Sequence, residues 1–180
     1  MGQQKRQNWL TGWLLPIVIG VAIALCIRQW VVSAAYVPSE SMYPTIPNPC
    51  YILVNKLATN LHGVKRGEVV VFHFPDEPTQ LYVKRVVGLP GDKVTVTPTS
   101  VYINGKLLAE PNPKISKDNT RGFGTYQVPA GHYFMMGDNR PVSDDSRFWT
   151  NKYVSRSAIV GEADFVLFPF NKITRIAQHF

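Results

Sequence analysis

Two serines lie in a short segment whose backbone is restricted on both sides by proline. Ser39 and Ser41 fall within the sequence PSESMYPT (38–45), between Pro38 and Pro44. Proline fixes its own φ angle and limits the conformation of the residue before it. Such a rigid segment suits a nucleophilic hydroxyl, which must face its substrate at a fixed angle. The alternative is a plain turn, in which the serine side chains bond to nearby backbone groups.

A basic pair inside an apolar segment is the second candidate for chemistry. Residues 81–87 read LYVKRVV. In a strand, Lys84 and Arg85 point to opposite faces, and the rest of both faces is apolar. A free lysine has a pKa near 10.4, and burial lowers it; reaching the range of 7–8 that suits a general base costs about 4 kcal/mol. The alternative is an edge strand whose charges are solvated.

A third segment, residues 137–149, is dense in charged and hydroxyl side chains. Residues 137–147 hold three aspartates, two arginines and two serines. Arginine–carboxylate pairs can fix the geometry of such a loop. The aspartates lack the spacing of a calcium loop, and the histidines and cysteines lack that of zinc ligands. We therefore expect a loop braced by ion pairs and no metal site.

The serine segment follows closely on an apolar stretch near the N-terminus. Residues 9–27 contain no charge and are followed by Arg28. This length suits one membrane-spanning helix. Lys5 and Arg6, within the polar residues 1–8, favour a cytoplasmic N-terminus because positive charges stay on that side.

These features predict a transmembrane helix at 9–28 and an extracytoplasmic domain at 36–180. The alternative is a cleavable signal peptide, because the small residues 33–35 (SAA) resemble its cleavage site. The apolar run is longer than the usual 7–15 residues of such peptides, which favours retention of the helix. Self-cleavage near Ser33 stays open.

The domain beyond residue 36 has the pattern of a β protein. Short β-branched and aromatic runs alternate with glycine and proline, and Asn104-Gly105 predicts a two-residue hairpin turn. Helical periodicity is weak here, and the polar residues 110–130 predict a long surface excursion. We expect a mostly antiparallel sheet or a partly closed barrel. Strands are predicted at 51–55, 68–74, 80–87, 93–97, 100–103, 106–109, 132–136 and 163–168.

The overall charge indicates which kind of binding partner to expect. The 180 residues carry a formal net charge of +7, which favours an anionic surface such as lipid headgroups. The basic residues are scattered and form no run of five or more, so nucleic acid is not the expected partner.

Taken together and in order, these segments resemble those of bacterial type I signal peptidases. The resemblance covers most of the chain, behind one membrane helix. The matching segments are PSESMYPT (38–45), YILVNK (51–56), RGEVVVF (66–72), YVKRVVGLPGD (82–92), GDNR (137–140), Ser143 and DSR (145–147).

The resemblance implies a role for each matching residue. Ser41 corresponds to the nucleophile and Lys84 to its general base. Ser39 corresponds to a hydroxyl that binds the oxyanion together with the Ser41 N–H. Ser143 corresponds to the residue that positions the lysine amine. Asp145 and Arg147 correspond to a supporting ion pair.

The resemblance also implies the fold, the substrate and the location. We expect a signal-peptidase-like β domain with a small insert at about 98–130, anchored in the bacterial cell membrane by a single span. Secretory preproteins are the expected substrates, cleaved after small residues, and no cofactor is expected. We expect the substrate pocket to be lined by Val37, Pro38, Met42, Tyr82 and Val83.

Two other functions fit parts of the pattern. Self-cleaving repressors share a serine–lysine pair, but they need an N-terminal DNA-binding domain where this chain has an apolar segment. A membrane-tethered β domain that binds partners without catalysis would not need both Ser41 and Lys84. The oligomeric state and the preferred preproteins are not predicted.

Overall fold

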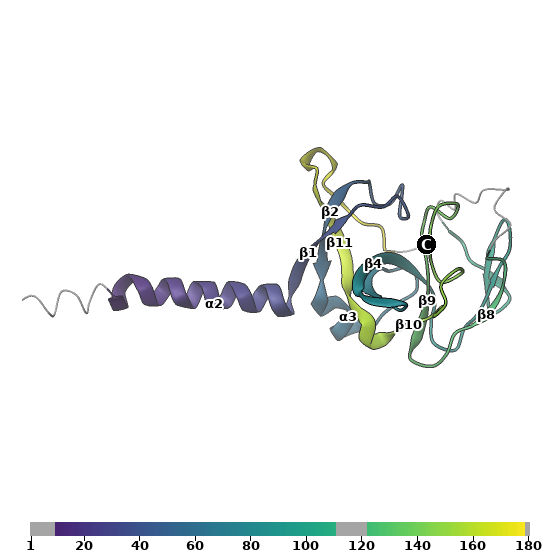
Figure 1. Cartoon of the computed structure of the whole chain (residues 1–180), viewed down its shortest axis with the longest axis horizontal. Helices are drawn as coiled ribbons and strands as arrows, with labels where there is room; N and C mark the ends of the chain where they lie inside the picture. Colours follow the sequence, from purple (N-terminus) through teal and green to yellow (C-terminus); the bar gives the residue numbers. More distant parts are fainter. Residues whose placement is uncertain (1–9, 111–121, 179–180) are drawn as a thin grey trace, which may run out of the picture.

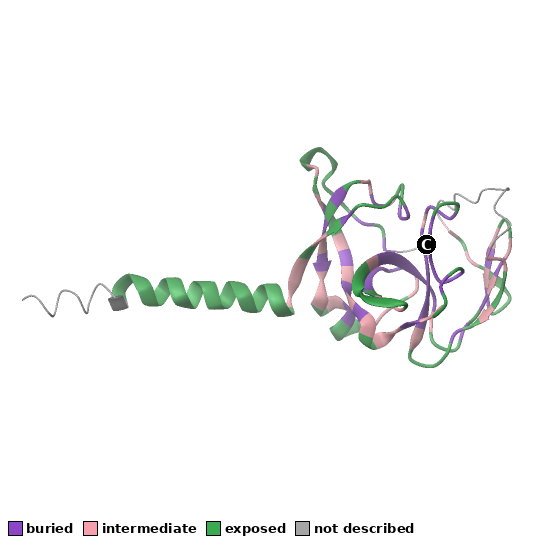
Figure 2. Ribbon diagram, viewed as in Figure 1, coloured by how far each residue is buried: buried purple, intermediate pink, exposed green. Residues whose placement is uncertain are grey.

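An apolar helix extends away from a β domain (Figure 1). The computed structural model describes residues 10–110 and 122–178. The helix begins with a π-helical turn, η1 (Leu10–Leu14), and continues as α2 (Leu15–Trp30), with Pro16 in its first turn. The segment Gly12–Trp30 is long and apolar enough to cross a membrane, with a mean hydropathy of 1.8. None of the α2 side chains is buried against the β domain (Figure 2).

In the larger sheet, the strand that contains residues 81–87 lies between two others. Its strand order is β1-β2-β11-β3-β4-β9-β10, with β12 paired to β11, and all pairs are antiparallel. The strands are β1 (Val32–Val37), β2 (Cys50–Asn55), β3 (Val69–Phe74), β4 (Glu77–Gly88), β9 (His132–Met136), β10 (Val154–Ser155), β11 (Ile159–Phe168) and β12 (Thr174–Arg175). The prediction of a mostly antiparallel β fold behind one apolar helix is confirmed.

A smaller sheet is built from the middle of the chain. Its order is β7-β6-β5-β8, again antiparallel. The strands are β5 (Lys93–Val96), β6 (Val101–Ile103), β7 (Lys106–Leu107) and β8 (Gly124–Gln127). The predicted hairpin turn is present, with positive φ angles of 52° at Asn104 and 82° at Gly105.

Three buried clusters hold the two sheets in place. One, which includes Val37, Met42 and Ile52, fills the space between β1, β2, β11 and the serine segment. A second surrounds Phe72 and Trp149. The third joins the small sheet to the large one, because it combines residues of β5 and β6 with residues of β4 and β9. The serine segment is therefore packed onto the core.

Several elements differ from the predictions. Residues 111–121 of the surface excursion predicted at 110–130 lie outside the described residues, and the remainder contains strand β8, which pairs with β5 and packs Tyr126 against the core. A short helix, α3 (Lys56–His62), was not predicted; the Asn55 side chain caps it by accepting hydrogen bonds from two backbone N–H groups. Strand β1 was also not predicted, and it contains the small residues 33–35, each paired with β2. Two short 3₁₀ turns, η2 (Arg156–Ala158) and η3 (Phe170–Lys172), complete the described structure.

Candidate active site

The Ser41 hydroxyl is held by the turn that follows β1. Within this turn the N–H of Tyr43 bonds to the Glu40 carbonyl at 3.0 Å, and Met42 is fully buried in the core. Asn139 supports the turn from the opposite side: its N–H donates to the Ser41 carbonyl at 3.0 Å, and its side chain donates to the Glu40 carbonyl at 3.1 Å. The turn is therefore held by the burial of Met42 in the core and by the hydrogen bonds from Asn139.

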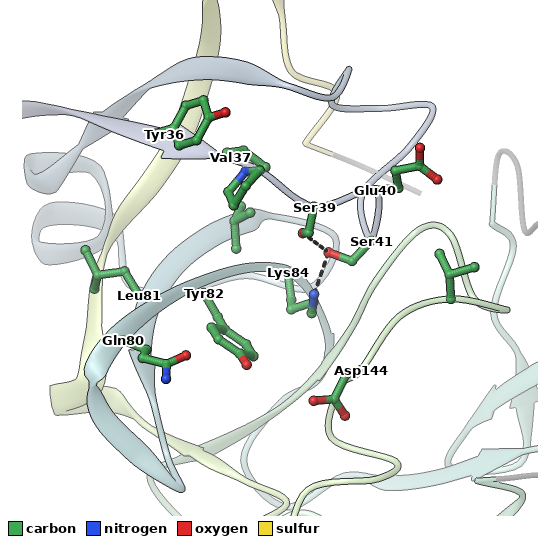
Figure 3. Close-up of a pocket in the computed structure, with 13 residues that line it drawn as sticks. Tyr36, Val37, Ser39, Glu40, Ser41, Gln80, Leu81, Tyr82, Lys84 and Asp144 are labelled. Carbon is green, nitrogen blue, oxygen red and sulfur yellow. Dashed lines mark hydrogen bonds between the residues drawn. The ribbon is translucent and has the colours of Figure 1, made fainter.

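Lys84 reaches Ser41 from β4. Its Nζ lies 2.6 Å from Ser41 Oγ, although the two residues are 43 positions apart. Ser39 Oγ lies 3.2 Å from the same hydroxyl (Figure 3). Lys84 is only 4% exposed and Ser41 5%, so the pair is largely shielded from water. A base and a nucleophile within hydrogen-bond distance form the arrangement that nucleophilic catalysis requires.

The surroundings of Lys84 favour its neutral form. Burial lowers the pKa of this lysine from 10.5 to about 8, because the ammonium loses its hydration. The carboxylates of Asp145, Asp144 and Asp138 oppose this effect, and the Arg147 guanidinium adds to it. Near pH 8, about half of the Lys84 side chains would thus be able to accept a proton.

Arg85 serves the structure on the other face of β4. Its guanidinium makes two hydrogen bonds to the Asp138 carboxylate, at 2.8 and 2.6 Å, and donates to the carbonyls of Gly67 and Ala177. Lys84 is 4% exposed and Arg85 3%, so their charges are not solvated, although β4 pairs with β9 only from Arg85 onward. The alternative interpretation, an edge strand with solvated charges, was wrong.

The loop after β9 is braced by a buried ion pair. Asp145 is fully buried and accepts hydrogen bonds from Arg147 Nε at 2.8 Å, from Arg147 Nη2 at 2.9 Å and from the Gly137 N–H at 3.0 Å. The same guanidinium donates to the Arg140 carbonyl at 2.8 Å. These bonds fix the path of residues 137–147 beside the serine turn.

Gly137 allows this loop to approach Ser41. A Cβ atom at this position would overlap the Ser143 hydroxyl and would lie 2.5 Å from the Ser41 carbonyl oxygen. Glycine is therefore required here for close approach of two backbones. Ser143 is 3% exposed, and its hydroxyl has no hydrogen-bond partner among the described residues, Lys84 included.

A cavity of about 430 Å³ opens beside the Ser41–Lys84 pair. Of the five residues predicted to form the substrate pocket, Met42 is the exception: its side chain points into the core and is fully buried, so its assignment to the pocket was wrong. The cavity is lined by Tyr36, Val37, Pro38, Ser39, Glu40, Ser41, Gln80, Leu81, Tyr82, Val83, Lys84, Val142 and Asp144 (Figure 3).

Some functional neighbours were missed from the sequence. Glu40, Val142 and Asp144 lie within motifs that were singled out, but nothing in their spacing indicated that they share one cavity. The support that Asn139 gives to the serine turn likewise depends on a long-range contact. No three histidine, cysteine, aspartate or glutamate side chains come together as a metal site within residues 10–110 and 122–178.

Comparisons with known proteins agree on one family. The family described as "Signal peptidase, peptidase S26" matches residues 10–168. "Signal peptidase I T" of Bacillus subtilis (strain 168) is 38% identical over 179 residues, covering 94% of this chain and 91% of its own. "Signal peptidase I" of Bacillus amyloliquefaciens is 39% identical, covering 95% of both chains. A crystal structure of a signal peptidase I from Enterococcus faecalis V583 is 33% identical with a TM-score of 0.48, covering 55% of this chain and 95% of its own.

Proposed function

We propose a mechanism from one premise: the chain belongs to the peptidase S26 family of signal peptidases. Membership supports the cleavage of signal peptides from preproteins as its activity. The finer proposal is that a serine–lysine dyad, Ser41 and Lys84, performs this cleavage at a membrane surface. The observation that carries it is the 2.6 Å contact between Lys84 Nζ and Ser41 Oγ in a buried site.

The reaction begins with neutral Lys84. Its amine takes the proton of the Ser41 hydroxyl as Oγ attacks the carbonyl carbon of the scissile peptide bond. The lysine then gives this proton to the leaving amine, which departs as the new N-terminus of the mature protein. The signal peptide remains attached to Ser41 as an ester. Lys84 next removes a proton from water, which hydrolyses the ester and restores the serine.

Two donors stabilise the oxyanion that forms during both steps. They are the backbone N–H of Ser41 and the hydroxyl of Ser39. Ser39 Oγ lies 3.2 Å from Ser41 Oγ, which places its hydroxyl beside the atom that attacks the substrate carbonyl. The proposed positioning of the lysine amine by Ser143 requires its buried hydroxyl, which makes no hydrogen bond to Lys84 in this structure, to rotate toward the amine. The pair of Asp145 and Arg147 maintains the loop on which Ser143 lies.

The substrate binds as an additional strand. The pairing of β4 with β9 begins only at Arg85, so residues 81–84 have no strand partner on that side among the described residues. An extended peptide there can make main-chain hydrogen bonds to β4. Val37 and Val83 line the cavity, and their apolar side chains suit the small residues proposed before the cut.

The location proposed is the bacterial cell membrane. The apolar helix anchors the protein in a single pass, with residues 1–8 in the cytoplasm and residues 36–180 outside. Lipid is the proposed partner of Trp30 and Tyr43, which are 70% and 45% exposed.

Substitution of the dyad tests the function. We expect Ser41→Ala and Lys84→Ala to abolish preprotein cleavage, and Lys84→Arg to fail too, because a guanidinium does not deprotonate. Ser39→Ala should lower turnover by about 10²–10³. The assay uses detergent-solubilised enzyme and a preprotein, with sequencing of the product N-terminus.

Matched controls separate chemistry from folding. Ser157→Ala and Lys93→Ala remove a serine and a lysine at exposed positions outside the cavity, and both variants should cleave normally. An acylating serine inhibitor should label wild-type Ser41 and not the Ser41→Ala variant. Substantial cleavage by a purified, folded Lys84→Ala variant would show that Lys84 is not the general base. Absence of both cleavage and labelling in the wild type would favour a binding protein instead.

A further inference from the structure

The apolar helix passes into the β domain without a linker. It ends at Trp30, and β1 begins at Val32, so Val31 alone lies between them (Figure 1). Both backbone groups of Val31 are bonded: its N–H donates to the Ile27 carbonyl at 2.8 Å, and its carbonyl accepts from the Lys56 N–H at 2.9 Å. The pairing of β1 with β2 starts at the next residue, Val32. Each residue at this point is therefore held either by the helix or by the sheet.

The Lys56 side chain fixes the end of the helix. Its Nζ donates to the carbonyls of Arg28 at 3.1 Å and Gln29 at 3.0 Å. The last carbonyls of a helix have no partner within it and carry partial negative charge, so a lysine ammonium is favourable there. Lys56 comes directly after β2 and begins α3. One side chain thus connects the apolar helix to the larger sheet. We call Val31 and the bonds of Lys56 the junction.

Strand β1 leads from the junction to the cavity. Tyr36 and Val37, at the end of β1, line the cavity beside Ser41. The segment from Val32 to Tyr36 extends over about 13 Å, at the usual rise of a strand. Because hydrogen bonds fix both the junction and β1, the cavity lies at a set distance and direction from the end of the helix.

We propose that the junction determines how many residues can separate the apolar helix of a preprotein from its cleavage site, with Lys56 as a positioning residue. The inference rests on the proposed function and names a constraint on its substrates. The apolar helix of a preprotein in the same membrane ends at about the level where α2 ends. A short connecting segment does not reach Ser41, and a long one brings the scissile bond to Ser41 less often, because effective concentration falls with the length of the connection.

Preproteins with different connecting segments test this constraint. They carry no insertion, or two or four glutamines between the apolar helix and the cleavage site. Full-length enzyme and preproteins are reconstituted together in vesicles of phosphatidylethanolamine and phosphatidylglycerol. We expect the wild type to cleave the preprotein with four added glutamines at least about tenfold more slowly than the preprotein without insertion. Soluble peptides with the same connecting segments should all be cleaved at similar rates, because no membrane sets their position.

Two changes to the enzyme should weaken the constraint. Lys56→Ala removes the bonds to Arg28 and Gln29 and should lower the ratio between the two rates. Lys56→Arg should restore the ratio, because a guanidinium can also donate to the last carbonyls of a helix. Insertion of Gly-Ser-Gly-Ser between Val31 and Val32 keeps Lys56 and should bring the ratio close to one. Cleavage of the soluble peptides should be unchanged in all three variants, which a general loss of folding would not allow.

The matched control is Lys106→Ala, which removes an exposed lysine of the small sheet and should preserve the ratio. Equal cleavage of all the preproteins by the wild type would overturn the inference. A ratio that stays the same in both Lys56→Ala and the insertion variant would overturn it as well. Neither result affects the proposed function, which fails only if the wild type cleaves none of the preproteins and none of the soluble peptides.

Discussion

Lys84 combines two properties that oppose each other in most proteins: it is basic and it is buried. Lys84 is 4% exposed, and burial lowers the pKa of its amine to about 8. A serine hydroxyl 2.6 Å away gives the neutral amine a proton to accept. The same desolvation that makes the residue useful as a base also makes its charged form costly to the folded protein.

The pH profile should report this amine directly. Because only neutral Lys84 accepts the serine proton, kcat/KM should fall about tenfold for each pH unit below the lysine pKa, with half of its maximal value near pH 8. The measurement is kcat/KM for a peptide substrate between pH 6 and pH 10. A profile still rising steeply above pH 9 would mean that Lys84 is an ammonium in the active enzyme.

Replacing Lys84 by an apolar residue should stabilise the fold. The lysine pKa is about 8 in the folded protein and 10.5 ordinarily, so both states are protonated at pH 7 and only the folded state carries a buried charge. This difference corresponds to about 3 kcal/mol. We expect Lys84→Met to raise the free energy of unfolding at pH 7 by up to that amount, measured by urea titration.

The increase in the free energy of unfolding caused by Lys84→Met should become smaller at high pH. Wild-type stability should rise between about pH 8 and pH 10.5, because the unfolded chain still binds a proton that the folded chain has lost. The Lys84→Met variant lacks this rise. Lys93→Met, at an exposed position, serves as the control and should change stability by less than about 0.5 kcal/mol. A less stable Lys84→Met variant at pH 7 would contradict the assignment.

At the scale of elements, the C-terminal segment closes a gap in the larger sheet. The Gln178 side chain accepts a hydrogen bond from the Val69 N–H at 2.7 Å and donates one to the Ala163 carbonyl at 2.5 Å. These groups lie on β3 and β11, just beyond the last residues that the two strands pair. The adjacent Ala177 carbonyl accepts from Arg85, which connects this segment to β4.

Gln178→Ala should therefore destabilise the domain. It leaves a buried N–H and a buried carbonyl without partners, and such losses cost about 1–3 kcal/mol. The free energy of unfolding at pH 8 is the measurement. Gln127→Ala is the matched control, since its side chain makes one exposed hydrogen bond, to the Gly91 carbonyl, and its loss should cost less than about 0.5 kcal/mol. Equal costs at the two positions would show that Gln178 does not bridge the strands.

At the scale of the whole molecule, the apolar helix and the β domain share little packing. No side chain of α2 is buried (Figure 2), and the Lys56 side chain bonds only to carbonyls at its end, those of Arg28 and Gln29. We therefore expect the domain to fold without residues 1–27. In the proposed function the helix keeps the active site next to membrane-inserted preproteins, which raises the effective concentration of the substrate.

Removal of residues 1–27 should separate the contribution of the helix to domain stability from its contribution to cleavage of membrane-inserted preproteins. We expect the midpoint of thermal unfolding to change by less than about 4 °C, because few contacts are lost. Cleavage of a soluble peptide should be retained, whereas cleavage of a membrane-inserted preprotein should fall at least about tenfold. Full-length enzyme in the same vesicles is the control. Equal loss of both activities would indicate that the helix contributes to the folded site itself.

Much of the fold was predictable because its signals are local. All eight predicted strands occur, since runs of β-branched residues favour extended backbone and Asn104-Gly105 favours a tight turn. The apolar helix was predictable from the number of consecutive uncharged residues alone. Strands β1 and β8 were missed because the small residues 33–35 of β1 and the glycine and polar residues of β8 interrupt the β-branched and aromatic pattern, and partner strands supply their hydrogen bonds.

The sequence by itself determined the types of residue available for catalysis and, by the order of its motifs, the family to which the chain belongs. It also indicated which strand face carries Lys84, because alternation is a property of local backbone geometry. Only the tertiary structure decided that Met42 belongs to the core and that Glu40 and Asp144 share one cavity with Lys84. The physical reason is that burial, distance and electrostatic field depend on segments tens of residues apart, and no local pattern encodes them.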